Sequence, residues 1–163
     1  MSNPSAIEPV LGKRRVVVTG LGIVSPIGNN AAEVIESLKS GKSGIEAAPD
    51  YVEHGFRSQI HGSIKLDPSE HIDRKLMRFM GNAAAYAYIA MTQAIEDAGL
   101  TEDLISNNRT GLIAGSGGAS TSNQVAATDI TRKNGSPRKM GPTMVPRVMG
   151  STVSANLCTA YGI

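Results

Sequence analysis

The chain has 163 residues, of which 40% are hydrophobic and 4% aromatic, so one domain with a mainly aliphatic core is expected. Its formal net charge is only +2, and its single cysteine, Cys158, excludes an intrachain disulfide and any metal site built on paired cysteines. Because the sequence has no signal-peptide pattern and no apolar run close to the about 20 residues of a membrane span, we expect a cytoplasmic protein without a membrane segment.

Residues 15–28, RVVVTGLGIVSPIG, predict a strand, a glycine-rich loop and the start of a helix. The β-branched run 16–18 is typical of a strand buried on both faces. The loop is similar to phosphate-binding loops, but the dinucleotide pattern GxGxxG fails because Ser25 stands in place of the third glycine. A tight crossing from strand to helix is the other interpretation. Asn29 or Asn30 is expected to cap a helix over residues 31–40, with Gly41 ending it.

Residues 42–63 are rich in turn formers and show no clear period. His54 and His61 lie here without metal-ligand spacing, so we expect them to be exposed or locally bonded. The longest helical region follows, with Gly81 as a joint between two helices and Gly99 as its end. Its apolar residues recur at i, i+3, i+4 and i+7, which predicts one buried face. That face consists of Leu76, Phe79, Met80, Ala83, Ala84, Ala87, Met91, Ala94, Ile95 and Ala98.

Three cations, Arg74, Lys75 and Arg78, stand near the start of this region. Their three- and four-residue spacing places them on one edge of a helix. Spacing alone is compatible with a solvated helix face and with a docking site for a phosphate or an acidic protein.

Residues 109–118, RTGLIAGSGG, predict a second strand that ends in glycines. Two apolar strands separated by helices predict a parallel α/β sheet. A polar helix capped by Ser120 or Thr121 is expected next, and then a helix over residues 145–161 that is interrupted at Gly150. Because two strands and four helices cannot close a sheet of this kind, we expect an incomplete domain.

The positive charge is concentrated late in the chain. Residues 130–163 carry five basic side chains and no acidic one, so that residues 1–129 have a formal charge of −3. Such a basic segment indicates an acidic partner. Nucleic acid is a weak candidate because single-strand binders use aromatic platforms, and the segment has only Tyr161. Cys158 lies in the last predicted helix, where a small buried hydrophobe is expected rather than a nucleophile.

Several stretches together resemble a known family: RRVVVTGLGIVSPIGNN, KLDPSEHIDRKLMRFM, AIEDAGL, RTGLIAGSGG and GPTMVPRVMGSTVSANL. They are similar to the N-terminal part of β-ketoacyl-[acyl-carrier-protein] synthases, and their sequence is closer to type I than to type II. The resemblance covers residues 13–163 and leaves residues 1–12 as a flexible tail. It implies a thiolase-like, five-layered αβαβα fold, of which this chain is the N-terminal part, and an obligate homodimer.

The implied activity is the decarboxylative Claisen condensation of acyl chains with malonyl-acyl-carrier protein in fatty acid elongation. The family's catalytic cysteine, histidines and lysine come after residue 163, so no catalytic residue is expected within residues 1–163. The chemistry needs no metal and no redox cofactor.

The resemblance also assigns binding residues. The acyl carrier protein is expected to dock on a basic surface, for which the matching positions are Arg74, Lys75, Arg78, Arg138 and Lys139. An acyl pocket at the dimer interface is expected to involve Gly118, Val145 and Met149.

Two other functions stay open at this point. Relatives that lack the cysteine act as non-catalytic partner subunits that set chain length. An α/β domain that binds nucleotides or nucleic acid is the third reading, against which the failed fingerprints and the scarce aromatic residues count.

Overall fold

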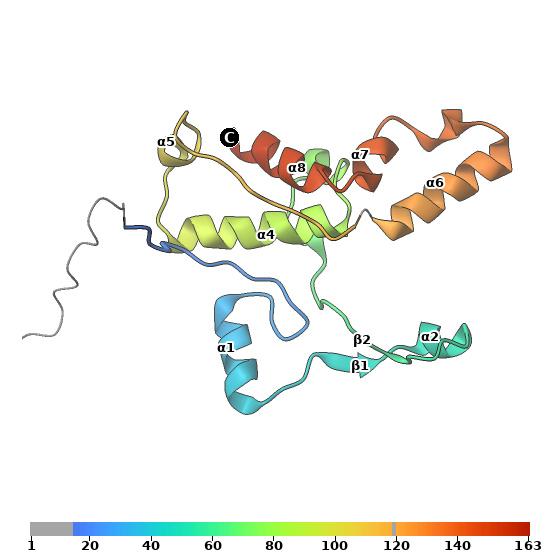
Figure 1. Ribbon diagram of the computed structural model, residues 1–163, viewed down its shortest axis with the longest axis horizontal. Helices are drawn as coiled ribbons and strands as arrows, with labels where there is room; N and C mark the ends of the chain where they lie inside the picture. Colours follow the sequence, from blue (N-terminus) through green and yellow to red (C-terminus); the bar gives the residue numbers. More distant parts are fainter. Residues whose placement is uncertain (1–14, 119) are drawn as a thin grey trace, which may run out of the picture.

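The computed structural model describes residues 15–118 and 120–163, and helix α4 (Asn82–Asp97) lies across its centre (Figure 1). Helix α8 (Thr152–Tyr161) packs along α4, and α1 (Ala31–Ser40) lies on the other side with the hairpin of β1 (Ile45–Ala47) and β2 (Ile60–Gly62). The remaining elements are α2 (Pro49–Glu53), η1 (Pro68–Glu70), α3 (Arg74–Met77), α5 (Glu102–Ile105), α6 (Thr121–Asn134), η2 (Pro137–Met140) and α7 (Met144–Val148). No helix within these two ranges combines the length and the apolar character needed to cross a lipid bilayer.

The first predicted helix is confirmed as α1, and Asn30 caps it. The Asn30 side chain accepts a hydrogen bond from the Glu33 amide at 3.0 Å, and the Glu33 carboxylate accepts one from the Asn29 amide at 2.8 Å. This reciprocal pair satisfies one free amide of the helix N-terminus and the amide of the residue before the cap. Gly41 ends the helix with a φ of 68°, in the left-handed region that glycine tolerates.

The core lies between α4, α8 and the segment before α4. Its buried residues are Ile72, Met80, Ala84, Ala85, Ile89, Val153 and Leu157. Ala85 and Ile89 stand outside the predicted apolar face, so the prediction of a single stripe was wrong for α4. The helix is covered on two sides, and one stripe describes only one of them. The joint at Gly81 is confirmed, since this residue is the N-cap of α4, and α7 and α8 are separated around Gly150 as predicted.

The C-terminal end of α8 is tied to the middle of α4 through Tyr161. Its hydroxyl lies 2.6 Å from the Thr92 hydroxyl, and its ring stacks on that of Tyr88 with centroids 5.4 Å apart. Partial burial raises the pKa of the Tyr161 hydroxyl above its ordinary value. Pro146, in α7, is compatible with a helix because it occupies the first turn, where an amide has no partner within the helix.

The glycine-rich stretch after residue 19 lies directly on the backbone of α4. A Cβ atom at Gly22 would be 1.8 Å from the carbonyl oxygen of Ala90, and one at Gly20 would be 2.2 Å from that of Ala94. The residues between and after these glycines are hydrogen-bonded to the same helix. The amide of Leu21 donates to Asp97 Oδ2 at 2.9 Å, and that of Ile23 donates to Gln93 Oε1 at 3.1 Å. These glycines are therefore required by close approach to the helix.

The two predicted strands do not form in the described part of the chain, which corrects the expected parallel sheet. Residues 16–18 and 112–114 have no assigned strand; Val16 is 90% exposed and Ile113 is fully exposed. The sheet found within residues 15–118 and 120–163 is the antiparallel β1–β2 hairpin, in a segment for which no strand was predicted. A strand needs a hydrogen-bonded neighbour, and an apolar run alone does not supply one.

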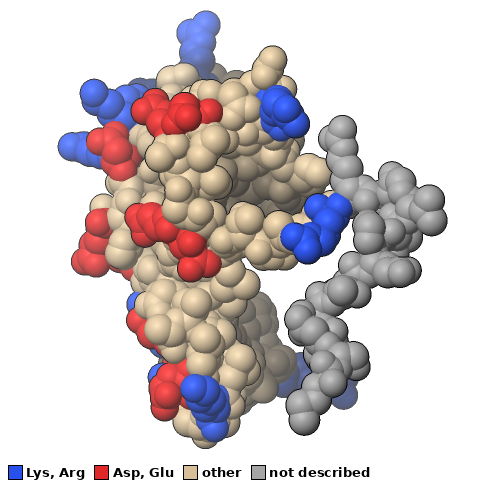
Figure 2. All heavy atoms as spheres, turned by 90° about the vertical axis from the view of Figure 1, so that its left-hand side faces the viewer, with Lys and Arg blue, Asp and Glu red and all other residues tan. Residues whose placement is uncertain are grey.

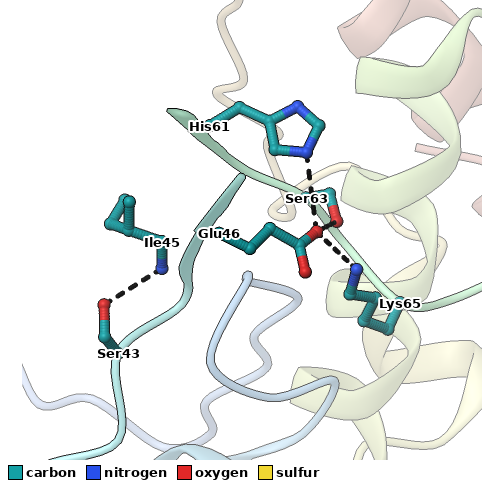
Figure 3. A network of polar contacts seen from close by, with 6 residues as sticks. All are labelled: Ser43, Ile45, Glu46, His61, Ser63 and Lys65. Carbon is teal, nitrogen blue, oxygen red and sulfur yellow. Dashed lines mark hydrogen bonds and ion pairs between the residues drawn. The ribbon is translucent and has the colours of Figure 1, made fainter. Parts of the chain in front are cut away.

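The β1–β2 hairpin is joined to the segment that follows it by a polar network (Figure 3). The Glu46 carboxylate accepts hydrogen bonds from Lys65 Nζ and Ser63 Oγ, and His61 Nε2 lies 3.5 Å from the same oxygen. The bond from Lys65 is the main reason why the pKa of Glu46 lies below its ordinary value, with Ser63 contributing next.

Replacing Gly22 by alanine in the full-length protein is expected to lower the free energy of unfolding by about 1–3 kcal/mol or more, because the added methyl group meets helix backbone that cannot move aside. Urea unfolding measures the change. Gly111→Ala is the matched control, since a Cβ there meets nothing within 4 Å. Equal costs for the two substitutions would contradict the close contact with α4.

The Glu46 network predicts a pH dependence. Because the pKa of Glu46 is lowered in the folded protein, its contacts stabilise the hairpin above the unfolded-state pKa, and this contribution is lost as the pH falls through the folded-state pKa. Carboxyl NMR titration of Lys65→Met should show the pKa of Glu46 moving up. In the control Lys39→Met, which changes a lysine of α1, the pKa of Glu46 should not change. An unchanged pKa of Glu46 in Lys65→Met would rule out Lys65 as the main cause of its lowering.

Candidate functional site

A basic depression lies where α3 meets α7. Asp73 caps α3 by accepting a hydrogen bond from the Lys75 amide at 2.7 Å, and the helix ends at Arg78 after little more than one turn. The depression is lined by Ser69, Ile72, Arg74, Met77, Arg78 and Arg147. The structure therefore brings Arg74 and Arg78 together, as the spacing predicted, over a partly apolar floor. Lys75 is exposed beside them but does not line the depression.

Arg147 is the member of this site that sequence reasoning did not assign. It comes from α7, and its Nε donates a hydrogen bond of 2.9 Å to the carbonyl oxygen of Arg78, 69 residues earlier in the chain. Its only signal in the sequence is membership of the basic segment 130–163. Helical spacing relates neighbours on one helix and so could not connect Arg147 with Arg74 and Arg78.

The arginines of the depression have no carboxylate partner in the part of the chain that the structure describes, where the ion pairs involve only Glu46 with His61 and Lys65. Acidic side chains gather elsewhere. Figure 2 shows the end of the molecule that lies to the left in Figure 1, with acidic groups across this face and basic groups mainly around its margins. Exposed acids at the end of α4 and in α5 are Glu96, Asp97, Glu102 and Asp103. Asp73 directly precedes Arg74, but no carboxylate forms an ion pair with these arginines within the described residues, so an anionic partner would find their charge unpaired.

The second predicted basic group, Arg138 and Lys139, lies on η2, which packs against α6. Both side chains are exposed, and the Ser136 hydroxyl caps η2 by accepting a bond from the Arg138 amide at 3.3 Å. Arg132 lines a separate shallow hollow along α6. Neither Arg138 nor Lys139 lines the depression that contains Arg74, so the two basic groups remain distinct surfaces within the described residues.

Two of the three predicted pocket residues come together. Gly118 and Met149 line a void between the start of α4, the segment before α6, and α7. Its volume is only about 20 Å³, which leaves room for about one water molecule. Val145 is 55% exposed and does not line it. A Cβ atom at Gly118 would meet nothing within 4 Å, so no close contact requires glycine here.

The glycine-rich loop has little to offer a phosphate. Most of its amides already have protein acceptors: Leu21 and Ile23 bond to α4 side chains, Ser25 and Gly28 bond to each other's carbonyl oxygens, and Ile27 and Asn29 bond to side chains of Ser25 and Glu33. Phosphate-binding loops work by pointing unpaired amides at the ligand. The interpretation as a tight crossing into a helix is the one that this geometry supports.

The remaining reactive side chains are scattered. Cys158 lies half-buried in α8, and His61 contacts Glu46, whereas His54 is exposed. Among the described residues, no three His, Cys, Asp or Glu side chains are grouped as a metal site requires.

Comparison with known proteins places these features in a family. The family model described as "Beta-ketoacyl synthase, N-terminal domain" matches residues 13–163. The 3-oxoacyl-[acyl-carrier-protein] synthase 1 of Haemophilus influenzae is 58% identical over 150 residues, which are 92% of this chain and 37% of that protein. The protein of the same name from Escherichia coli K12 is 48% identical over 151 residues, with the same two shares.

A solved structure of the same family also resembles this chain. The crystal structure of a β-ketoacyl synthase from Burkholderia phymatum matches with a TM-score of 0.78 and 26% identity, covering 93% of this chain and 38% of that one. The chain thus spans somewhat more than a third of the length of its relatives. Since the family match extends over residues 13–163, the chain belongs to the β-ketoacyl synthase family and carries sequence of its N-terminal domain.

Proposed function

We propose that the protein is a β-ketoacyl-acyl-carrier-protein synthase of type I, an acyltransferase that elongates fatty acyl chains. The observation that carries this proposal is the identity of 58% and 48% to two proteins that both bear the name 3-oxoacyl-[acyl-carrier-protein] synthase 1. The basic depression at Arg74, Arg78 and Arg147 supports it, because an acidic carrier protein is a suitable partner for an uncompensated positive surface.

The proposed reaction has two stages. A cysteine thiolate first takes the acyl group from a carrier-protein thioester, and the carrier thiol leaves. Malonyl-carrier protein then loses CO2, and its carbanion attacks the acyl thioester; the new carbon–carbon bond forms and the cysteine thiolate is released. The developing oxyanion requires hydrogen-bond donors. We expect the groups that perform these steps outside residues 1–163, whose contribution is docking and support.

We further propose that residues 13–163 form the first part of a thiolase-like, five-layered fold that works as a homodimer. Exposed apolar runs support this: Val16, Val18 and Ile113 are between 88% and 103% exposed in extended segments. Such runs are suited to strands of a larger sheet, where neighbouring strands cover both faces.

A direct assay tests the function. The full-length protein is mixed with acyl- and malonyl-carrier protein, and the products are identified by mass spectrometry. A carrier-bound 3-oxoacyl chain two carbons longer is the expected product. If no product forms alone but the product length of an active synthase changes on mixing, the protein is a non-catalytic partner subunit instead.

If the carrier protein docks through charge, the double variant Arg74→Glu with Arg78→Glu should bind carrier-bound substrate more weakly. Each exposed contact contributes about 0.2–1 kcal/mol, so reversal of both charges should raise the KM for carrier-bound substrate roughly tenfold and leave kcat nearly unchanged. Steady-state kinetics at several salt concentrations measure this. Arg57→Glu, a reversal at an exposed arginine next to β2, is the control. A similar rise of KM in the control would argue against a localised docking surface.

Gly118→Met is expected to abolish the use of long acyl chains while short ones are still elongated, because the side chain would shorten the acyl pocket proposed here. A Cβ atom at Gly118 meets nothing within 4 Å, so the first side-chain atom of the substitution does not clash. Activity across a series of acyl-chain lengths measures the effect, with Gly117→Met as the matched control at a similarly open position. Equal loss for long and short chains would contradict the assignment.

A further inference from the structure

The short segment that carries Arg78 is held from two later helices. Arg147 Nε, on α7, donates to the Arg78 carbonyl oxygen at 2.9 Å, and Asn156 Nδ2, on α8, donates to the Phe79 carbonyl oxygen at 3.2 Å. The segment itself lies between α3 and Gly81, the N-cap of α4. Met80, which is buried in the core, and local backbone bonds also hold this segment, and the two side-chain donors add restraints from later in the chain.

The position of Arg147 serves the basic depression in two ways. The bond to the Arg78 carbonyl restrains the backbone from which the Arg78 side chain projects. Arg147 also lines the depression with Arg74 and Arg78, so it is the third basic residue there. The Arg147 side chain extends from α7 to the C-terminal end of α3, where Arg78 lies.

We infer that Arg147 is a positioning residue of the carrier-docking surface, which it serves by holding Arg78 in place. This inference rests on the proposed function, because it takes an acidic carrier protein as the occupant. The uncompensated charge of Arg74, Arg78 and Arg147 favours an acidic occupant, and the apolar floor of Ile72 and Met77 favours a protein surface over a small anion.

The test measures the Kd of the full-length protein for acyl-carrier protein in Arg147→Met. We expect Kd to rise about three- to tenfold and its salt dependence to weaken, because a charge and a restraint on a second charge are both lost. The matched control is Arg109→Met, at an exposed arginine outside the depression.

A double substitution separates positioning from simple charge. Because Arg78→Ala keeps the backbone carbonyl but removes the side chain, Arg147→Met should then cost about half as much or less. The full cost in that background would overturn the positioning role, as would an unchanged Kd. If the unsubstituted protein binds the carrier but makes no product, only the catalytic proposal fails, and if it does not bind the carrier, both fail.

Discussion

The close contact between the glycine-containing segment 20–23 and the backbone of α4 governs the arrangement of this chain. Gly20 and Gly22 lie so close to the carbonyl oxygens of Ala90 and Ala94 that no side chain fits between them. The intervening amides are satisfied by side chains of the same helix. This contact commits one side of α4 to the extended segment and leaves the other side for α8, with which it forms the core.

The basic depression is the second feature on which the arrangement of the chain has a clear effect. The basic depression is assembled from α3 and α7, which are far apart in sequence, and a guanidinium-to-carbonyl hydrogen bond links them. Arginine suits this position because its planar group can donate to a carbonyl and still present positive charge. The same helix α7 contributes to the void beside Gly118, so the basic depression and the region proposed for acyl binding share one short element.

Local features were predictable from the sequence, and non-local ones were not. The Asn30 cap, the joint at Gly81 and the break at Gly150 follow from rules that involve a few neighbouring residues. The runs 16–18 and 112–114 have strand composition, but strand pairing depends on partners distant in sequence. Arg147 was overlooked for the same reason, since its contact with Arg78 spans 69 residues.

The long sequence separation of the glycine contact also shapes how the chain folds. Leu21 and Asp97 are 76 residues apart, so joining them closes a long loop, which costs entropy before the contact is made. Helix α4 needs only local contacts to begin forming, and long-range pairings are slower to form. The segment 20–24 is thus expected to dock late on a helix that is already formed, and its amides should gain protection from hydrogen exchange after those of α4 during refolding.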